Sequence, residues 1–176
     1  MRQAQRIGSN FCARFRRGAA LALAVVLLTA ASLPSRAADK TLPVPRFVAL
    51  RSDEVNLRTG PGEQYPIDWV LTRKNMPVEI ILEFKNWRKI RDADGTEGWV
   101  NERMVAGKRT VLVRGQVRQL HESPSAESGV VARAEPGVVA ALLTCQKAWC
   151  RVEASGIHGW LKRDEIWGVY PDEVVE

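Results

Sequence analysis

Residues 55–70 read VNLRTGPGEQYPIDWV, and this stretch contains the turn around which the rest of the chain is arranged. It begins as a strand, because its first and third residues, both apolar, point to one side of an extended chain and Asn56 and Arg58 to the other. Gly60-Pro61-Gly62 then ends the strand, since glycine permits positive φ and proline has no N–H for a ladder. The stretch predicts a strand, a long loop that carries Tyr65, and a return strand that begins near Trp69.

A second alternating pattern occupies residues 78–84. Its apolar residues Val78, Ile80, Leu82 and Phe84 fall on one face and its glutamates on the other, which is typical of a half-buried strand. Asn86 lies in the turn that follows, and a strong hairpin signal, Asp-Gly, comes at residues 94–95. Two further short strands are therefore expected, around Trp87 and around Trp99.

The same order of landmarks recurs 61 to 63 residues later in the chain. The matched pairs are Leu57 with Leu120, Pro61 with Pro124, Trp87 with Trp149, Gly95 with Gly156, Gly98 with Gly159, and Trp99 with Trp160. We therefore predict an all-β protein that contains one small domain twice. The expected domains span residues 47–113 and 114–176, after a linker at residues 38–46.

The first 37 residues read as a secretory signal peptide. A basic start precedes an apolar run of 15 residues from Ala19 to Leu33, which is shorter than the roughly 20 residues that span a bilayer. Ser35 and Ala37 are small residues at a plausible cleavage point. We expect a periplasmic or secreted protein without a membrane span once the signal is cleaved; an uncleaved anchor is the alternative.

The net charge of +6 comes from this leader. It contains six arginines and no acid, so residues 38–176 keep 20 basic and 20 acidic residues. Nucleic-acid binding needs a concentrated basic face, and here the basic residues are interleaved with acids, as in Lys162-Arg163-Asp164-Glu165. No nucleic-acid partner is expected.

Cys145 and Cys150 are the two cysteines that follow the leader. At an offset of 62 they correspond to Glu83 and Arg88, which flank a short hairpin connection and should lie opposite one another on antiparallel strands. Disulfides are stable in exported proteins. We predict a Cys145–Cys150 bond where the first copy has an ion pair; two buried free thiols are the alternative.

The motif Asn56-Leu57-Arg58-Thr59-Gly60-Pro61-Gly62, together with the Asp-Gly turn and Gly98-Trp99, resembles the bacterial Src-homology-3-like (SH3-like) domains of exported proteins. The resemblance covers about residues 47–170, in two copies. The second copy has serine at 123 and 125 in place of both motif glycines, which affects its loop more than its barrel. The resemblance implies two tandem, partly open β-barrels of five or six strands that bind cell wall or protein.

Tryptophan is the feature most typical of a binding surface, because its flat apolar body suits sugar rings and prolines. Tyr65, Trp69, Trp87 and Trp149 are candidate ligand-binding residues, and filling of the two cores is the alternative. Trp99 and Trp160, each after a glycine in a closing strand, are expected in the cores. Two aromatics near the end, Trp167 and Tyr170, are expected to pack the copies together.

Reactive chemistry has little support in the sequence. The histidines, His121 and His158, are far apart and are expected to be surface loop residues, so no metal site is predicted. Ser123 and Ser125 near His121 fit a polar turn, as Asp92 and Asp94 fit a hairpin turn. Neither a phosphate loop nor a dinucleotide motif occurs, so no cofactor and no enzyme activity are expected.

These patterns together predict a non-catalytic, exported binding module. Cell-wall peptidoglycan or a wall-associated protein is the expected partner. The alternative is a protein–protein adaptor or a structural accessory of a cell-envelope complex.

Overall fold

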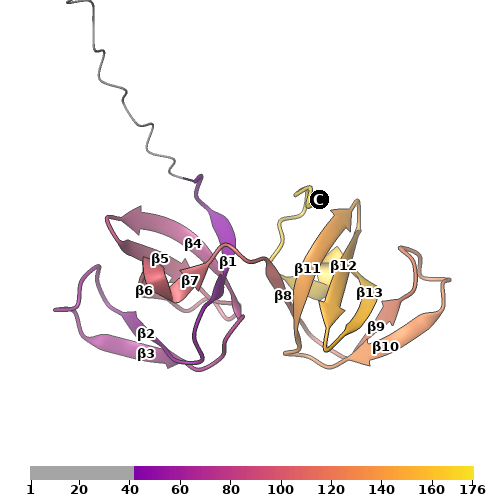
Figure 1. Cartoon of the computed structure of the whole chain (residues 1–176), viewed down its shortest axis with the longest axis horizontal. Helices are drawn as coiled ribbons and strands as arrows, with labels where there is room; N and C mark the ends of the chain where they lie inside the picture. The colour runs from indigo at the N-terminus through magenta and orange to yellow at the C-terminus, as the bar shows by residue number, and fades with distance from the viewer. Residues whose placement is uncertain (1–41) are drawn as a thin grey trace, which may run out of the picture. The chain divides into compact units, whose positions relative to one another are not determined.

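The computed structural model describes residues 42–176 (Figure 1). The predicted signal peptide and the start of the linker lie outside the described residues. Between residues 42 and 176, no helix has the length and apolar character needed to cross a membrane.

The first copy is an antiparallel sheet of seven strands in the order β3-β2-β6-β5-β4-β1-β7. Its strands are β1 (Arg46–Leu50), β2 (Val55–Arg58), β3 (Ile67–Leu71), β4 (Pro77–Phe84), β5 (Trp87–Arg91), β6 (Glu97–Asn101) and β7 (Val105–Ala106), with the short 3-10 helix η2 (Glu102–Met104) before β7.

The second copy repeats this topology strand for strand, in the order β10-β9-β13-β12-β11-β8-β14. Its strands are β8 (Thr110–Val113), β9 (Arg118–His121), β10 (Val130–Ala134), β11 (Val139–Gln146), β12 (Trp149–Ala154), β13 (Ile157–Lys162) and β14 (Ile166–Trp167), with η3 (Arg163–Glu165) before β14. The predicted all-β fold and its duplication are confirmed. Each sheet has seven strands, more than the five or six implied by the resemblance, because the two-residue strands β7 and β14 also pair.

The predicted boundary after residue 113 assigned β8 to the first domain. In the structure β8 pairs with β11 and β14, so it belongs to the second sheet. The second copy therefore begins before Thr110.

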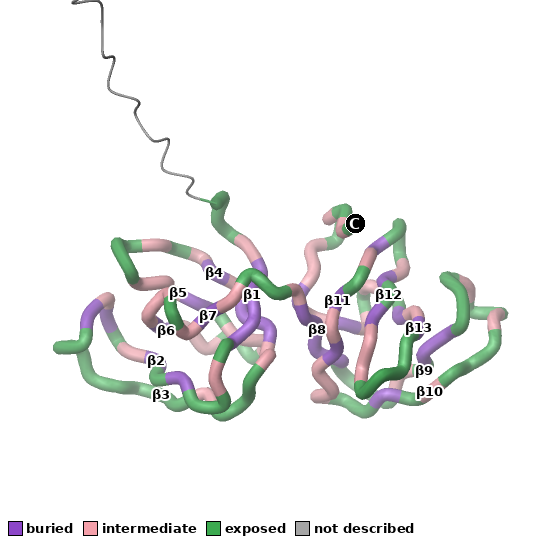
Figure 2. The backbone as a smooth tube through the Cα atoms, in the orientation of Figure 1, coloured by how far each residue is buried: buried purple, intermediate pink, exposed green. Residues whose placement is uncertain are grey.

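Each copy buries its own core from alternate positions of its strands (Figure 2). The first core includes Leu57, Ile80, Ile90 and Val100, and the second includes Leu120, Leu142, Val152 and Leu161. The edge strands β3 and β10 are mostly exposed. Each sheet thus has a buried inner face and an outer face toward solvent.

The alternation predicted for residues 78–84 holds only for the first half of β4. Val78 and Ile80 are buried, but Leu82 and Phe84 are about half exposed, at 50% and 49%. The β4–β5 register shifts between Ile80 and Leu82, so Ile81 forms a bulge and the residues beyond it turn to the other face. The prediction that all four share one face was wrong.

Aromatic residues near the C-terminus join the two copies, as predicted. The Phe47 ring of β1 lies 5.0 Å from the Trp167 ring and 4.7 Å from the Tyr170 ring. The Tyr170 hydroxyl donates a hydrogen bond of 2.8 Å to Glu79.

Candidate functional site

The β2–β3 loop of the first copy is built around the ring of Tyr65. A Cβ added to Gly60 would lie 2.4 Å from the Tyr65 ring, so only glycine lets the ring pack against this backbone. The Arg58 guanidinium donates to the backbone carbonyls of Tyr65, at 2.7 Å, and Glu63, at 3.1 Å. Arg58 therefore holds the loop from the sheet side.

The corresponding loop of the second copy keeps the same turn without the two motif glycines and without tyrosine. Ser123 and Ser128 are equivalent to Gly60 and Tyr65 at an offset of 63, and Ser128 Oγ donates to the Ser123 carbonyl at 3.1 Å. His121, the equivalent of Arg58, places its Nδ1 3.3 Å from the Ser128 carbonyl. Loss of the glycine equivalent to Gly60 is therefore compensated by loss of the ring that had required it.

The strand register places three residues side by side on the outer face of the first sheet. Trp99 of β6 pairs with Lys89 of β5 on one side and with Arg58 of β2 on the other. Trp87 lies two residues before Lys89 and so shares this face. We call Arg58, Trp87, Lys89 and Trp99 the first outer face.

The second outer face consists of the equivalent residues His121, Trp149, Arg151 and Trp160, with Lys162 added. Trp160 pairs with Arg151 and with His121, and Trp149 pairs with Lys162. The rings of His121 and Trp149 meet edge to face with centres 5.4 Å apart, and Lys162 Nζ lies 5.8 Å from the Trp149 ring centre. Trp149 is thus held by an aromatic neighbour and a cation, a geometry that fixes its flat face.

A cavity of about 340 Å³ opens beside this face, lined in part by Arg118, His121, Lys162 and Glu165. Arg118 pairs with Glu165 at 3.4 Å. A hydrogen bond from Ser125 is the main cause that lowers the pKa of Glu127, with smaller contributions from Lys162 and His121. The surroundings of the second outer face therefore carry both charges at neutral pH.

Ion pairs border the first outer face. Lys89 and Arg91 each contact the carboxylate of Glu97 at 2.7 Å. The hydrogen bond from Lys89, followed by that from Arg91, lowers the pKa of Glu97 below its ordinary value. The Glu97 carboxylate at this edge of the face is therefore ionised and paired with two cations.

The four candidate ligand-binding residues do not form one site. Trp87 and Trp149 occupy equivalent positions, one on each outer face, and both are half-buried. Tyr65 lies in its loop at 39% exposure, and Trp69 lies on the edge strand β3 at 59%. The ring pairs in contact between residues 42 and 176 involve Phe47, Trp167, Tyr170, His121 and Trp149, and so include none of Tyr65, Trp69 and Trp87.

Two expectations about side-chain placement were wrong. Trp99 and Trp160 are half-buried on the outer faces, because their neighbours Val100 and Leu161 occupy the cores. Gly98 and Gly159 instead permit close packing, since a Cβ there would lie 2.4 and 2.8 Å from Leu57 and Leu120.

His121 is also not a surface loop residue. It lies on β9 and is 8% exposed, whereas His158 is exposed on β13. The sequence did not lead us to place His121 and Lys162 on a binding face. The repeat offsets match them to Arg58 and Asn101 of the first copy, and this match was the signal that could have placed them on strands.

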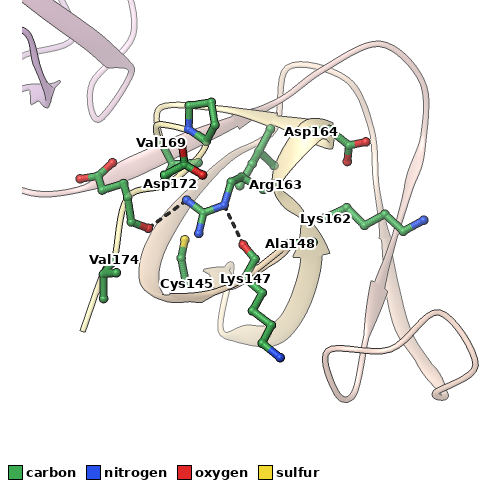
Figure 3. Close-up of a pocket in the computed structure, with 12 residues that line it drawn as sticks. Cys145, Lys147, Ala148, Lys162, Arg163, Asp164, Val169, Asp172 and Val174 are labelled. Carbon is green, nitrogen blue, oxygen red and sulfur yellow. Dashed lines mark hydrogen bonds between the residues drawn. The ribbon is translucent and has the colours of Figure 1, made fainter.

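A cavity of about 930 Å³ lies in the second copy beside the C-terminal segment, residues 168–176 (Figure 3). The cation at its centre is Arg163. Its guanidinium already donates hydrogen bonds to the backbone carbonyls of Lys147, Tyr170 and Glu173, at 3.0, 2.6 and 3.0 Å, and so is not free for a ligand. Lys147, Lys162, Asp164 and Asp172 add charges of both signs to the lining. This cavity is better explained as a packing gap between the C-terminal segment and the second sheet than as a ligand site.

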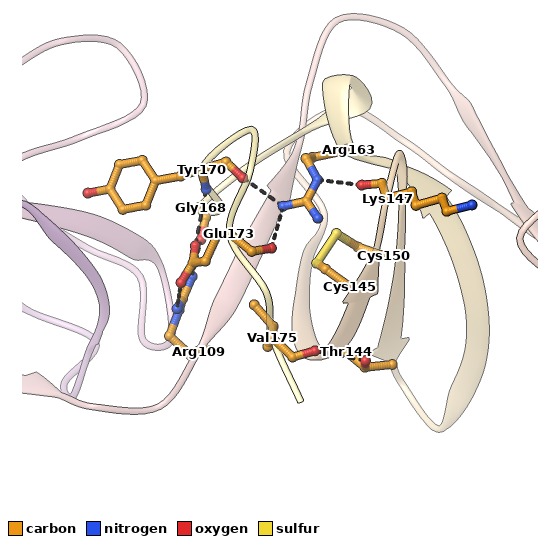
Figure 4. Close-up of a disulfide and its surroundings, with 10 residues drawn as sticks. All are labelled: Arg109, Thr144, Cys145, Lys147, Cys150, Arg163, Gly168, Tyr170, Glu173 and Val175. Carbon is orange, nitrogen blue, oxygen red and sulfur yellow. Dashed lines mark hydrogen bonds and ion pairs between the residues drawn. A yellow bond between two sulfur atoms is a disulfide. The ribbon is translucent and has the colours of Figure 1, made fainter.

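The predicted Cys145–Cys150 disulfide is confirmed, with Cα atoms 4.1 Å apart (Figure 4). The cysteines pair directly across β11 and β12, and Glu83 pairs in the same way with Arg88 across β4 and β5. Arg88 Nε lies 2.9 Å from Glu83 Oε1, so the first copy has the expected ion pair.

Polar turn residues behave as structural elements. Asp92 Oδ1 accepts hydrogen bonds from the N–H groups of Asp94 and Thr96, at 3.0 and 2.8 Å. Ser125 donates to Glu127 within its own loop. In the described part of the chain, no group of three or more histidine, cysteine or acidic side chains is placed to hold a metal ion.

Solved structures of other proteins show partial similarity to this chain. Among solved structures, the chain is similar to NlpC2 from Trichomonas vaginalis at 11% identity and a TM-score of 0.33, with 72% of this chain and 49% of that chain covered. It is also similar to an NlpC/P60 family protein from Bacillus cereus at 13% identity and a TM-score of 0.32, with 69% and 55% covered. The chain thus spans about half the length of these proteins.

A comparison with curated proteins gives no match. The family model described as bacterial SH3 domain matches twice, at residues 51–107 and 118–168, which is more than half of the chain. The first match covers β2 to β7 and the second covers β9 to β14, so each includes all but the first strand of one sheet. The chain belongs to the bacterial SH3 domain family.

Proposed function

We propose that this chain is a non-catalytic, exported tandem binding module that recognises cell-wall peptidoglycan through its two outer faces. The observation that carries the proposal is the duplicated arrangement of Trp87 with Trp99 and of Trp149 with Trp160. These tryptophans lie on a solvent-facing surface and not in the core, at equivalent places in both copies, and this arrangement points to a shared ligand.

The second outer face has chemistry suited to a glycan that carries peptides. The Trp149 ring presents a flat apolar surface, on which the apolar face of a sugar ring packs well. Lys162, 5.8 Å from that ring, supplies an ammonium for a peptide carboxylate. The edge-to-face contact with His121 orders Trp149 before binding, which reduces the entropy lost on association.

Purified sacculi test this proposal. We expect the protein without residues 1–37 to be retained on sacculi at low salt, and Trp149→Ala or Trp87→Ala to weaken retention by about tenfold, since stacking on one aromatic is worth about 1–1.5 kcal/mol. Trp69→Ala is the control of matched residue type, because Trp69 lies on the edge strand and outside both faces. A folded sample that passes through sacculi unretained at low salt contradicts the proposal.

A protein–protein adaptor of the cell envelope is the second candidate. The exposed apolar residues Leu82 and Phe84 on β4 favour it, because exposed apolar patches commonly mark protein contacts.

A further inference from the structure

The C-terminal segment extends the second sheet by one residue pair. The N–H of Cys145 donates to the carbonyl of Val175 at 2.9 Å, and these two residues form an antiparallel bridge. Thr144 Oγ1 donates to the same carbonyl at 2.8 Å (Figure 4). The side of β11 beyond its pairing with β8 is therefore covered by an extended segment.

The equivalent side of β4 is open in the first copy. At the repeat offset of 62, Thr144, Cys145 and Gln146 correspond to residues 82–84 of β4. β1 pairs with β4 only as far as Arg46 opposite Ile80, and among residues 42–176 no backbone pairs with this side of Glu83. Prolines at 43 and 45 explain why β1 does not continue, since proline has no N–H for the ladder.

Apolar side chains are exposed along this open edge. Leu82 and Phe84 are 50% and 49% exposed, whereas the second copy has threonine and glutamine at these positions. Leu42 and Val44, which lie just before β1, are also exposed. Exposed apolar residues beside an unpaired strand are the combination that natural proteins normally avoid unless a partner covers it.

We propose that residues 81–84 of β4 form a docking edge that takes an extended segment of a partner protein, added as an antiparallel strand. The partner's segment has two apolar residues that flank a polar one. The apolar residues cover Leu82 and Phe84, and the polar one faces Glu83, whose carboxylate already binds Arg46 and Arg88.

Two other occupants fit this edge less well. Residues 38–41 of this chain read Ala-Asp-Lys-Thr and lack the large apolar residues needed to cover Leu82 and Phe84. A second copy paired strand to strand about Glu83 would place two glutamates directly opposite, which is unfavourable.

Nuclear magnetic resonance with a defined peptide tests the proposal. The probe is the acetylated heptapeptide amide Thr-Val-Thr-Val-Thr-Val-Thr, added to the protein without residues 1–37 up to about 1 mM, a concentration that detects weak binding. We expect amide shifts centred on residues 81–84 and slower hydrogen exchange of the Glu83 N–H. A peptide with N-methyl groups on alternate residues, which cannot complete the ladder, should give no shifts.

Matched lysine substitutions supply the control. Phe84→Lys should weaken peptide binding by about tenfold, because lysine on an edge strand opposes pairing and one apolar contact is lost. Gln146→Lys, at the equivalent position of the second copy, should leave peptide binding unchanged. Both substitutions are at exposed positions, so both variants should remain folded.

Three outcomes would overturn the docking edge. They are the absence of shifts at residues 81–84 at the highest peptide concentration, equal shifts with the N-methylated peptide, and self-association through β4 without peptide. Retention on sacculi is measured separately with Trp149→Ala, a change in the second copy that leaves β4 intact, so failure of the docking edge is distinguishable from failure of peptidoglycan binding.

Discussion

At the scale of single residues, the two copies close the same loop in different ways. Gly60 leaves room for the Tyr65 ring, whereas Ser123 and Ser128 hydrogen-bond to each other. The backbone turn is conserved between the copies, since Gly62 N donates to Gly60 O at 3.0 Å and Ser125 N to Ser123 O at 2.7 Å. A glycine here is needed because of the ring and not because of the turn.

Gly60→Ala should therefore destabilise the protein by about 1–3 kcal/mol, as overpacking does, because the new Cβ meets the Tyr65 ring. The double variant Gly60→Ser with Tyr65→Ser should recover most of this loss, since it installs the pair found in the second copy. Urea unfolding of the single and double variants measures both effects. Gly107→Ala, where an added Cβ meets nothing within 4 Å, is the control.

At the scale of elements, β4–β5 and β11–β12 are equivalent hairpins with different cross-strand links. Both place one residue pair directly opposite on the two strands, Glu83 with Arg88 and Cys145 with Cys150. The ion pair contributes roughly 0.2–1 kcal/mol and a disulfide across so short a loop about 2 kcal/mol. The second hairpin is therefore the more strongly cross-linked one.

Transfer of the disulfide to the first copy tests this equivalence. The double variant Glu83→Cys with Arg88→Cys should form a second disulfide, since the two strands already have the register of Cys145 and Cys150. Intact-mass measurement should show a gain of about four hydrogens on reduction, compared with about two for the original protein, because each disulfide takes up two. Two alkylatable thiols in the oxidised variant would contradict the shared register.

The hairpins also show which features a sequence can predict. The offset of 62 placed the cysteines opposite each other correctly, because the turn and the strand ends have distinct residues. The bulge at Ile81 was not predictable, because apolar residues at 80, 81 and 82 fit either face equally well. Trp99 and Trp160 were assigned to the cores from their size, but in so small a barrel the alternation with Gly98 and Val100 decides which residue is buried.

At the scale of the whole molecule, the contacts of Tyr170 link the copies. Burial, and then the hydrogen bond to Glu79, raise the pKa of the Tyr170 phenol above its ordinary value. Burial opposes ionisation of Glu173, but hydrogen bonds from Arg109 and from the Tyr170 N–H outweigh it and lower the pKa of that carboxyl. The C-terminal segment is therefore held in place by the neutral phenol of Tyr170 and the ionised carboxylate of Glu173.

The raised pKa of Tyr170 predicts an alkaline limit to stability. The folded state favours the neutral phenol, so its contribution is complete below the ordinary tyrosine pKa of about 10 and is lost as the pH rises beyond it. Tyr170→Phe should cost about 1 kcal/mol at pH 7 through loss of the bond to Glu79. The difference in the free energy of unfolding between Tyr170→Phe and the original protein should become smaller above pH 10.

Guanidinium unfolding between pH 7 and 11 measures this difference. Tyr65→Phe, which removes the other tyrosine hydroxyl of the chain, is the control and should leave the pH dependence unchanged. Stability curves of Tyr170→Phe and the original protein that remain parallel to pH 11 would rule out the coupling of Tyr170 ionisation to folding.

The position of the linking aromatics along the chain has a consequence for biosynthesis. All strands of the first sheet are complete once Ala106 has left the ribosome, whereas Trp167 and Tyr170 emerge more than 60 residues later. During that interval the nascent first barrel has its Phe47 ring uncovered and vulnerable to aggregation.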